Sequence, residues 1–323
     1  MSSTPIDARA AALRDRLRGG LAAAALTPMT RAGEVDLDVA EAYFRRLAGS
    51  GADVLAVLAH TGRGPFLAAE TRAGVITRAR RAGVPVIVGV GGAQDGGHGG
   101  GHGGGQGGQN GGQGGGTARA VADARMAAEL GADGVLVFPE PGDRVALHEA
   151  VWSAAGLPMI AFDLYTDPCP PAALRRILDL PGVAGLKTAL LSDAMGCQRT
   201  IALTREAGRL AITGEDRMFA ASLLWGAQAA LVGVAAASVG TTAAVLRAYE
   251  GGDLRGFEKA AARLDRLAAA TFTAPAEGPM EGYVQRMAWL AAEEGLIPEE
   301  HAHDPYGPAL PDGERARVLA AAR

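Results

Sequence analysis

A lysine stands near the end of a short apolar segment, Val183 to Thr188, that follows the turn residues Pro181 and Gly182. Apolar runs of this length between turn residues are typical of buried strands. Burial disfavours the ammonium form of lysine. A desolvated lysine can lose its proton and attack a carbonyl carbon to form a Schiff base, which arginine cannot do. Lys187 is therefore a candidate nucleophile, although a lysine snorkelling at a strand edge remains an alternative from this segment alone.

The rarity of lysine along the chain supports the interpretation of Lys187 as a nucleophile. The sequence contains 31 lysines and arginines together, but only Lys187 and Lys259 are lysines. A chain that uses arginine for nearly every positive charge has lysine where an apolar strand stops. This favours a chemical role for Lys187.

A second group of polar residues follows another apolar segment, Asp53 to Leu58. The chain continues there as Ala59-His60-Thr61-Gly62-Arg63. The Thr61 hydroxyl and the backbone N–H groups of this turn can bind a carboxylate through charge-assisted hydrogen bonds. His60 is either a structural histidine bonded in the turn or a functional group. Arg63 is either a substrate ligand or a solvated surface arginine.

The remaining elements must bring these residues together. Short apolar segments alternate with amphipathic helical patterns about eight times between residues 20 and 250, which predicts βαβ units and a parallel sheet. The expected strands are 20–29, 53–58, 84–90, 134–138, 158–165, 183–188, 210–216 and 229–234. Eight such units favour a closed (β/α)₈ TIM barrel, in which the ends of the strands share one face. No G-x-G-x-x-G motif follows the first expected strand, which weakens a dinucleotide-binding interpretation.

Three further segments lie outside this repeat. Residues 1–19 are expected to be an N-terminal helical segment, and 251–323 a C-terminal helical extension with helices at 254–269, 280–294 and 313–322. Residues 91–116 are almost entirely Gly, Gln and His, so we expect a flexible low-complexity insertion in the barrel, ending where a helix begins at Thr117. Two alternatives are a lid over the active site and a metal ion bound by His98 and His102. The favoured interpretation is a low-complexity insertion that the fold tolerates and that has no function.

Composition limits the function classes. The net charge of −4 gives no sign of a nucleic-acid partner, and no run of eighteen or more apolar residues predicts a membrane span. The first twenty residues lack the apolar core of a signal peptide. Cys169 and Cys197 show no metal-ligand or redox spacing. We therefore expect a cytoplasmic protein without a metal or other cofactor.

Taken together, the order and spacing of these motifs resemble the dihydrodipicolinate synthase/N-acetylneuraminate lyase family, from Gly20 to about Pro298. The resemblance implies a (β/α)₈ barrel that forms a homo-oligomer, a dimer or a tetramer, and a Schiff base between Lys187 and pyruvate or another 2-oxo acid. His60, Thr61, Gly62 and Arg63 stand where the family has its carboxylate pocket, Gly-Thr-Thr-Gly-Glu. The resemblance also implies substrate contacts for Gly214, in the family's Ser-Gly-Asp turn, and for the backbone carbonyl of Leu231.

The departures from the family pattern are equally informative. Phe162 stands where the family has a tyrosine that relays protons, and phenylalanine can neither donate nor accept a proton. The tyrosine pair that many members carry after strand four is absent at Phe138-Pro139. The arginine that binds the aldehyde's carboxylate in true synthases falls at about Asp167, which inverts the charge.

The sequence thus predicts a class I, Schiff-base lyase or aldolase that is not a true dihydrodipicolinate synthase. Lys187 is the predicted nucleophile, and Tyr165 and His60 are the candidates for proton transfer. Tyr165 could equally be a loop aromatic that caps the barrel. Two alternatives remain: a dehydratase or hydrolase acting on a 2-oxo sugar acid, and a non-catalytic ligand-binding member of the family.

Overall fold

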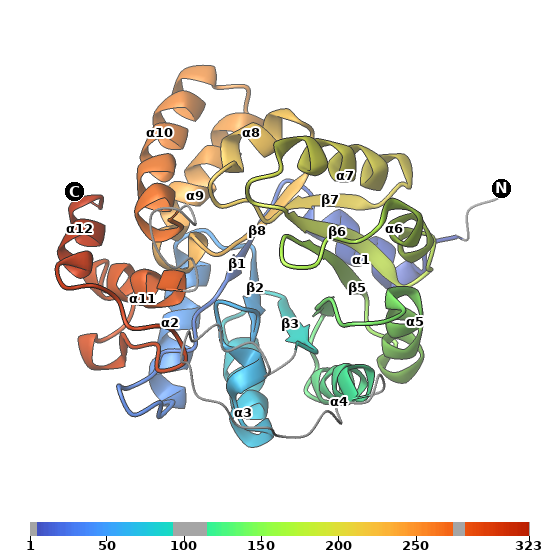
Figure 1. The fold of residues 1–323 in the computed structure, drawn as a ribbon, viewed down its shortest axis with the longest axis horizontal. Coiled ribbons are helices and arrows are strands. Elements are labelled where there is room, and N and C mark those ends of the chain that lie inside the picture. Colours follow the sequence, from blue (N-terminus) through green and yellow to red (C-terminus); the bar gives the residue numbers. More distant parts are fainter. Residues whose placement is uncertain (1–4, 93–114, 274–281, 323) are drawn as a thin grey trace, which may run out of the picture.

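The computed structural model describes residues 5–92, 115–273 and 282–322. Eight parallel strands close into a barrel in which each strand pairs with the next along the chain and β8 pairs with β1 (Figure 1). This confirms the (β/α)₈ prediction. The strands are β1 (Leu21–Ala24), β2 (Val54–Val57), β3 (Val86–Val90), β4 (Gly134–Val137), β5 (Met159–Leu164), β6 (Val183–Ala189), β7 (Leu210–Thr213) and β8 (Ala229–Val232).

Helices surround the barrel on its outside (Figure 1). The described helices up to the end of the repeat are α1 (Ala8–Leu17), α2 (Leu37–Gly49), α3 (Ala69–Arg80), α4 (Gly115–Glu129), α5 (Arg144–Ala155), α6 (Pro171–Leu178), α7 (Ala194–Glu206), α8 (Phe219–Leu224) and α9 (Ala235–Glu250). A short 3-10 helix, η1 (Gly64–Phe66), precedes α3. Several begin at an aspartate whose carboxylate accepts a backbone N–H, as Asp36 does for α2 and Asp143 for α5.

The strands bury both of their faces, as expected for a parallel barrel. The inward side chains form one apolar cluster that includes Ile87, Leu136, Ile160 and Ile212. Helix α1 joins this cluster through Leu13 and Leu17, so the N-terminal segment packs on the barrel interior. The outward side chains form a larger cluster with the surrounding helices.

The predicted C-terminal extension is helical. Helices α10 (Leu254–Thr271), α11 (Tyr283–Glu293) and α12 (Glu314–Ala320), with the 3-10 helix η3 (Glu299–His301), lie together beside α9 and α2 (Figure 1). Arg286 on α11 is almost fully buried. It donates to the Glu314 carboxylate at 2.6 Å and to the Thr271 carbonyl at 3.2 Å, which joins the three helices.

The first strand is shorter than predicted, Leu21–Ala24 instead of 20–29, and the end of the glycine-rich insertion also differs from the sequence prediction. Most of the insertion, 93–114 with both histidines singled out above, lies outside the described residues. Helix α4 begins at Gly115 rather than at Thr117, so Thr117 lies within the helix instead of capping it. In the part of the chain that the structure describes, no helix is long and apolar enough to cross a bilayer.

Candidate active site

A cavity of about 450 Å³ opens at the carboxyl ends of the strands. Its wall includes His60, Thr61 and Arg63 after β2, Tyr165 after β5, Lys187 on β6 and Gly214 after β7. The structure therefore brings most of the predicted residues, from the ends of four different strands, around one space. Two of the predicted residues are not in its wall. The Gly62 carbonyl accepts a 2.7 Å hydrogen bond from the Thr27 hydroxyl, and Leu231 is fully buried in the barrel core, while Gly233 borders the cavity instead.

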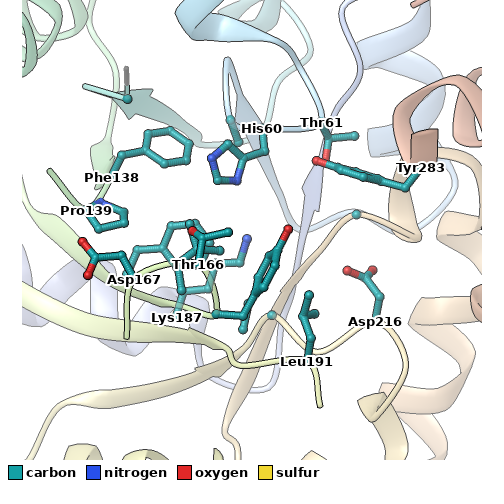
Figure 2. A pocket seen from close by; sticks show the side chains of 18 of the residues that line it. His60, Thr61, Phe138, Pro139, Thr166, Asp167, Lys187, Leu191, Asp216 and Tyr283 are labelled. Carbon is teal, nitrogen blue, oxygen red and sulfur yellow. The ribbon is translucent and has the colours of Figure 1, made fainter. Parts of the chain in front are cut away.

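Lys187 lies at the centre of this cavity (Figure 2). Its backbone pairs with Phe162 of β5 and Ile212 of β7, and only 9% of the residue is exposed. The side chain extends across Gly214, where an added Cβ would lie 2.5 Å from the lysine Cε. Only glycine leaves room for the lysine at this position. The Nζ atom lies 4.3 Å from the centre of the Phe162 ring.

Burial lowers the pKa of Lys187 to about 8, although the negative charges of Asp216 and Glu215 act in the opposite direction. The free amine is therefore accessible close to neutral pH, whereas an exposed lysine titrates near 10.4. This is the protonation state that Schiff-base formation requires.

Asp216 is the acidic neighbour of the amine. Its carboxylate accepts the Val234 N–H at 2.7 Å, and burial raises its pKa to about 6. An added Cβ on Gly233 would lie 3.4 Å from the Thr61 hydroxyl oxygen and 3.6 Å from an Asp216 carboxylate oxygen. Glycine at 233 thus keeps open a space that both polar groups border.

Glu215 holds the neighbouring turn in place. This fully buried carboxylate accepts the N–H groups of Leu190 at 2.5 Å and Leu191 at 3.0 Å, and burial raises its pKa to about 7. Among the described residues, the non-glycine positions with positive φ are Leu58, Arg63 and Leu191. They lie in the turns after β2 and β6, close in sequence to Thr61 and Lys187. Such strained backbone often clusters at functional sites.

An aromatic cluster forms another part of the wall. The His60 ring lies 4.4 Å from Phe138 and 6.0 Å from Phe162, and these two phenylalanines are 5.8 Å apart. Burial, together with the charges of Lys187 and Arg63, lowers the pKa of His60 to about 3. The imidazole is therefore neutral at physiological pH and packs as an aromatic ring.

Two arginines near the mouth of the cavity are paired with carboxylates. Arg63 binds Asp304 with two donors, at 3.0 and 2.5 Å, which joins the β2 turn to the C-terminal region. Arg144, buried at the start of α5, forms an ion pair with Asp167. A carboxylate therefore stands at position 167, and its ion-pair partner Arg144 was not foreseen from the sequence.

No metal-binding arrangement is found within the described ranges, where no three His, Cys, Asp or Glu side chains are grouped to hold an ion. Cys169 and Cys197 are buried free thiols. The cavity thus brings together a buried amine, an acid, hydroxyl groups and aromatic rings.

Comparison with known proteins gives these residues a context. The model of the dihydrodipicolinate synthetase family matches residues 110–320. The chain belongs to this family. The 4-hydroxy-tetrahydrodipicolinate synthase of Salinibacter ruber is 31% identical over 195 residues, covering 54% of this chain and 55% of that enzyme. The Bifidobacterium animalis synthase is 25% identical over 244 residues, 73% of each protein. The chain thus aligns with about half the length of the first relative.

Solved structures share the fold of this family member at low sequence identity. N-acetylneuraminate lyase from Mycoplasma synoviae has a TM-score of 0.72 at 16% identity, with 95% of this chain and 97% of that chain covered. Dihydrodipicolinate synthase from Agrobacterium tumefaciens has a TM-score of 0.76 at 23% identity, with 96% and 98% covered. A prophage protein of the same family from E. coli K12, solved with pyruvate, has a TM-score of 0.76 at 18% identity, with 93% and 96% covered.

Among the residues of the cavity wall that were not predicted from the sequence, Asp216 and Tyr283 carry ionisable groups. Asp216 had a signal, since two consecutive acids, Glu215 and Asp216, follow an apolar strand. Tyr283 lies in the C-terminal extension, far along the chain from the strand ends, and no local pattern marks it. Tyr165, a predicted proton carrier, also borders the cavity but is 40% exposed.

Proposed function

We propose that this protein is a class I lyase or aldolase that forms a Schiff base between Lys187 and pyruvate or a related 2-oxo acid. The observation that carries the proposal is a buried amine with a pKa of about 8, positioned on β6 in a cavity at the carboxyl ends of the barrel strands. Active sites of this barrel fold are found at that face.

The family relationship supports the same chemistry. Members of the dihydrodipicolinate synthetase family are Schiff-base, pyruvate-dependent aldolases and lyases. The structurally similar E. coli protein was solved with pyruvate. In this chain the Thr61 turn is the proposed ligand of the substrate carboxylate, and the aromatic cluster is the proposed contact for the remainder of the substrate. We also expect a cytoplasmic homo-oligomer, and sedimentation at several protein concentrations would test the oligomeric state.

A non-catalytic, ligand-binding role is the second candidate. It is favoured by Phe162, which places a ring without a hydroxyl 4.3 Å from the amine. A dehydratase or hydrolase would keep Lys187 and differ in the atoms lost after the Schiff base forms. The first test must therefore be whether a covalent intermediate forms at all.

The experiment is reductive trapping. The protein is incubated with pyruvate and borohydride, and its intact mass is measured, with 2-oxobutyrate and longer 2-oxo acids as further probes. We expect one stable adduct per chain, located on Lys187 by peptide mapping and absent from Lys187→Ala. The variant Lys259→Ala is the matched control and should trap normally. An adduct on Lys259, or none with any of these acids, would overturn the proposal.

A further inference from the structure

Tyr283 reaches the cavity from outside the barrel repeat. It is the first residue of α11 and is half-buried in the cavity wall. Its ring stacks on Phe272, with centres 5.0 Å apart and planes inclined by 23°. Its hydroxyl end lies beside Thr61 (Figure 2), and hydrogen bonding from the Thr61 side chain acts to lower the pKa of the tyrosine. A tyrosine hydroxyl from the C-terminal extension therefore contacts the residue proposed to bind the substrate carboxylate.

Contacts around α11 fix this hydroxyl in position. The Gln285 side chain donates to the Ala302 carbonyl at 2.8 Å and accepts the Asp304 N–H at 2.9 Å. Asp304 in turn binds Arg63, two residues beyond Thr61. Helix α11 is thus joined to the β2 turn twice, directly through Tyr283 and indirectly through Asp304. Such double anchoring holds a relay group within hydrogen-bonding reach of its partner, as proton transfer requires.

Burial keeps Tyr283 protonated. Burial raises its pKa, while the Arg63 guanidinium and the Thr61 hydrogen bond act in the opposite direction. Asp216, which borders the same space as Thr61, also raises the pKa of Tyr283. The phenol is therefore a proton donor at physiological pH, and the hydroxyl of Thr61 can both accept and donate.

The other two candidates for proton transfer are less suited. His60 is neutral with a pKa of about 3, so its ring is too weak a base to hold a proton at neutral pH. Tyr165 is 40% exposed, whereas Tyr283 is half-buried in the cavity wall. Phe162 carries no hydroxyl.

We propose that the hydroxyl of Tyr283, acting through Thr61, relays the protons of Schiff-base formation and of enamine formation in this cavity. Tyr283 thereby supplies from α11 the hydroxyl that Phe162 lacks on β5. This proposal rests on the proposed function of Lys187. Thr61 is the group placed next to the substrate, and Tyr283 acts through it.

The steps balance without another reactant. The Lys187 amine forms a bond to C2 of the 2-oxo acid, and the carbonyl electron pair moves to oxygen, which takes a proton from the Thr61–Tyr283 pair. The nitrogen returns one proton to the pair, and a second transfer to the C2 hydroxyl lets it leave as water, which gives the iminium. Loss of a C3 proton to the pair then gives the enamine. No oxidation or reduction occurs.

The test follows C3 exchange of pyruvate, because this needs no aldehyde partner. Wild-type protein in D₂O should exchange the methyl protons, as measured by proton NMR. We expect Tyr283→Phe to slow this exchange about 10²-fold or more, the usual scale for the loss of a general acid–base. The phenylalanine keeps the stacking on Phe272, so the melting temperature and the pyruvate Kd should change little.

Matched variants separate the relay from a structural role. Tyr249→Phe removes a hydroxyl that donates to the Leu223 carbonyl at 2.8 Å, outside the cavity wall, and should exchange normally. Thr61→Val should reproduce the loss seen in Tyr283→Phe, and Thr61→Ser, which keeps the hydroxyl, should restore most of the rate. Phe162→Tyr combined with Tyr283→Phe should recover exchange, because a hydroxyl then returns from β5.

The possible outcomes are distinct. Normal exchange in Tyr283→Phe with a large loss in Tyr165→Phe would overturn the relay and assign it to Tyr165. If Tyr283→Phe lowered the exchange rate and the affinity for pyruvate by the same factor, the relay would also be overturned, since Tyr283 would then serve binding alone. Absence of both exchange and a trapped adduct in the wild-type protein would instead contradict the proposed function itself.

Discussion

The cavity has two dissimilar walls that meet at Lys187 (Figure 2). The aromatic wall consists of His60, Phe138 and Phe162, whose rings lie 4.4 to 6.0 Å apart. The polar wall consists of Thr61, Asp216 and Tyr283. The aromatic wall is built from strand ends alone, whereas the polar wall also depends on a helix of the C-terminal extension. The barrel therefore supplies most of the cavity wall, and the extension contributes a tyrosine to it.

The largest effect is expected where the two walls meet. Lys187→Ala should abolish borohydride trapping and reduce any turnover by about 10⁴-fold or more, the scale seen when a nucleophile is removed. Lys187→Arg should behave in the same way, because guanidinium does not lose its proton. Intact-mass spectrometry measures the adduct. Unchanged trapping in either variant would show that another amine is the nucleophile.

The next largest effect concerns the contacts that hold the polar wall in place. Asp304→Asn should lower the free energy of unfolding by about 3 kcal/mol, because it leaves the largely buried Arg63 without its carboxylate partner. C3 exchange should fall with it, since Asp304 links α11 to the β2 turn. Denaturant unfolding and NMR exchange are the measurements. The control is Asp179→Asn, at the C-cap of α6, where both quantities should stay unchanged.

If Asp304→Asn slows exchange while pyruvate binding persists, the polar wall depends on the extension as described. Full exchange in a measurably destabilised protein would show that the Tyr283–Thr61 hydrogen bond alone is sufficient to hold α11 in place.

A smaller effect is expected on the pH dependence of trapping. Above a pH of about 6 the Asp216 carboxylate is charged and favours the ammonium form of Lys187, which holds the pKa of the lysine up at about 8. Asp216→Asn removes this charge, so the pKa of Lys187 should fall. The rate of adduct formation, which rises as the free amine appears, should then rise at lower pH. The amide oxygen can still accept the Val234 N–H, so the turn should persist.

Glu215→Gln is the matched comparison for Asp216→Asn. Glu215 also raises the pKa of Lys187, but its effect is smaller than that of Asp216. The pH profile of adduct formation in Glu215→Gln should therefore shift in the same direction as in Asp216→Asn, but by a smaller amount. A shift towards higher pH in either variant would contradict the electrostatic account of the amine.

The sequence predicted the barrel and one side of the site because both follow from local patterns. Apolar segments that end in Lys187 and in the His60-Thr61 turn necessarily meet at one face once the barrel closes. Tyr283 was missed because its position depends on how α11 packs against α9 and α12, which is set by long-range contacts such as Arg286 with Glu314. The compensation of Asp167 was missed for the same reason, because Arg144 comes from another helix.

The smallest effect concerns the second substrate. Asp167 pairs with Arg144, and Arg63 pairs with Asp304, so both guanidinium groups near the cavity mouth are already engaged by carboxylates. An aldehyde that carries a carboxylate, such as aspartate semialdehyde, would have to compete with these carboxylates for the guanidinium groups, and would meet the negative charge of Asp167. We therefore expect weak synthase activity, with kcat/KM below about 10⁴ M⁻¹s⁻¹, the low end of ordinary enzymes.

Asp167→Asn tests this directly. Removing the carboxylate leaves Arg144 available to a substrate anion, so kcat/KM for aspartate semialdehyde should rise by about 10-fold, while kcat/KM for an uncharged aromatic aldehyde should stay the same. One charge-assisted hydrogen bond in a half-exposed site contributes about 1.5 kcal/mol, which corresponds to that factor. Because Asp167 is more than half exposed and Arg144 also bonds the residue 167 carbonyl, the fold should tolerate the change. An equal rise in kcat/KM for both aldehydes would indicate that the substitution widens the cavity opening rather than making the Arg144 guanidinium available to the substrate.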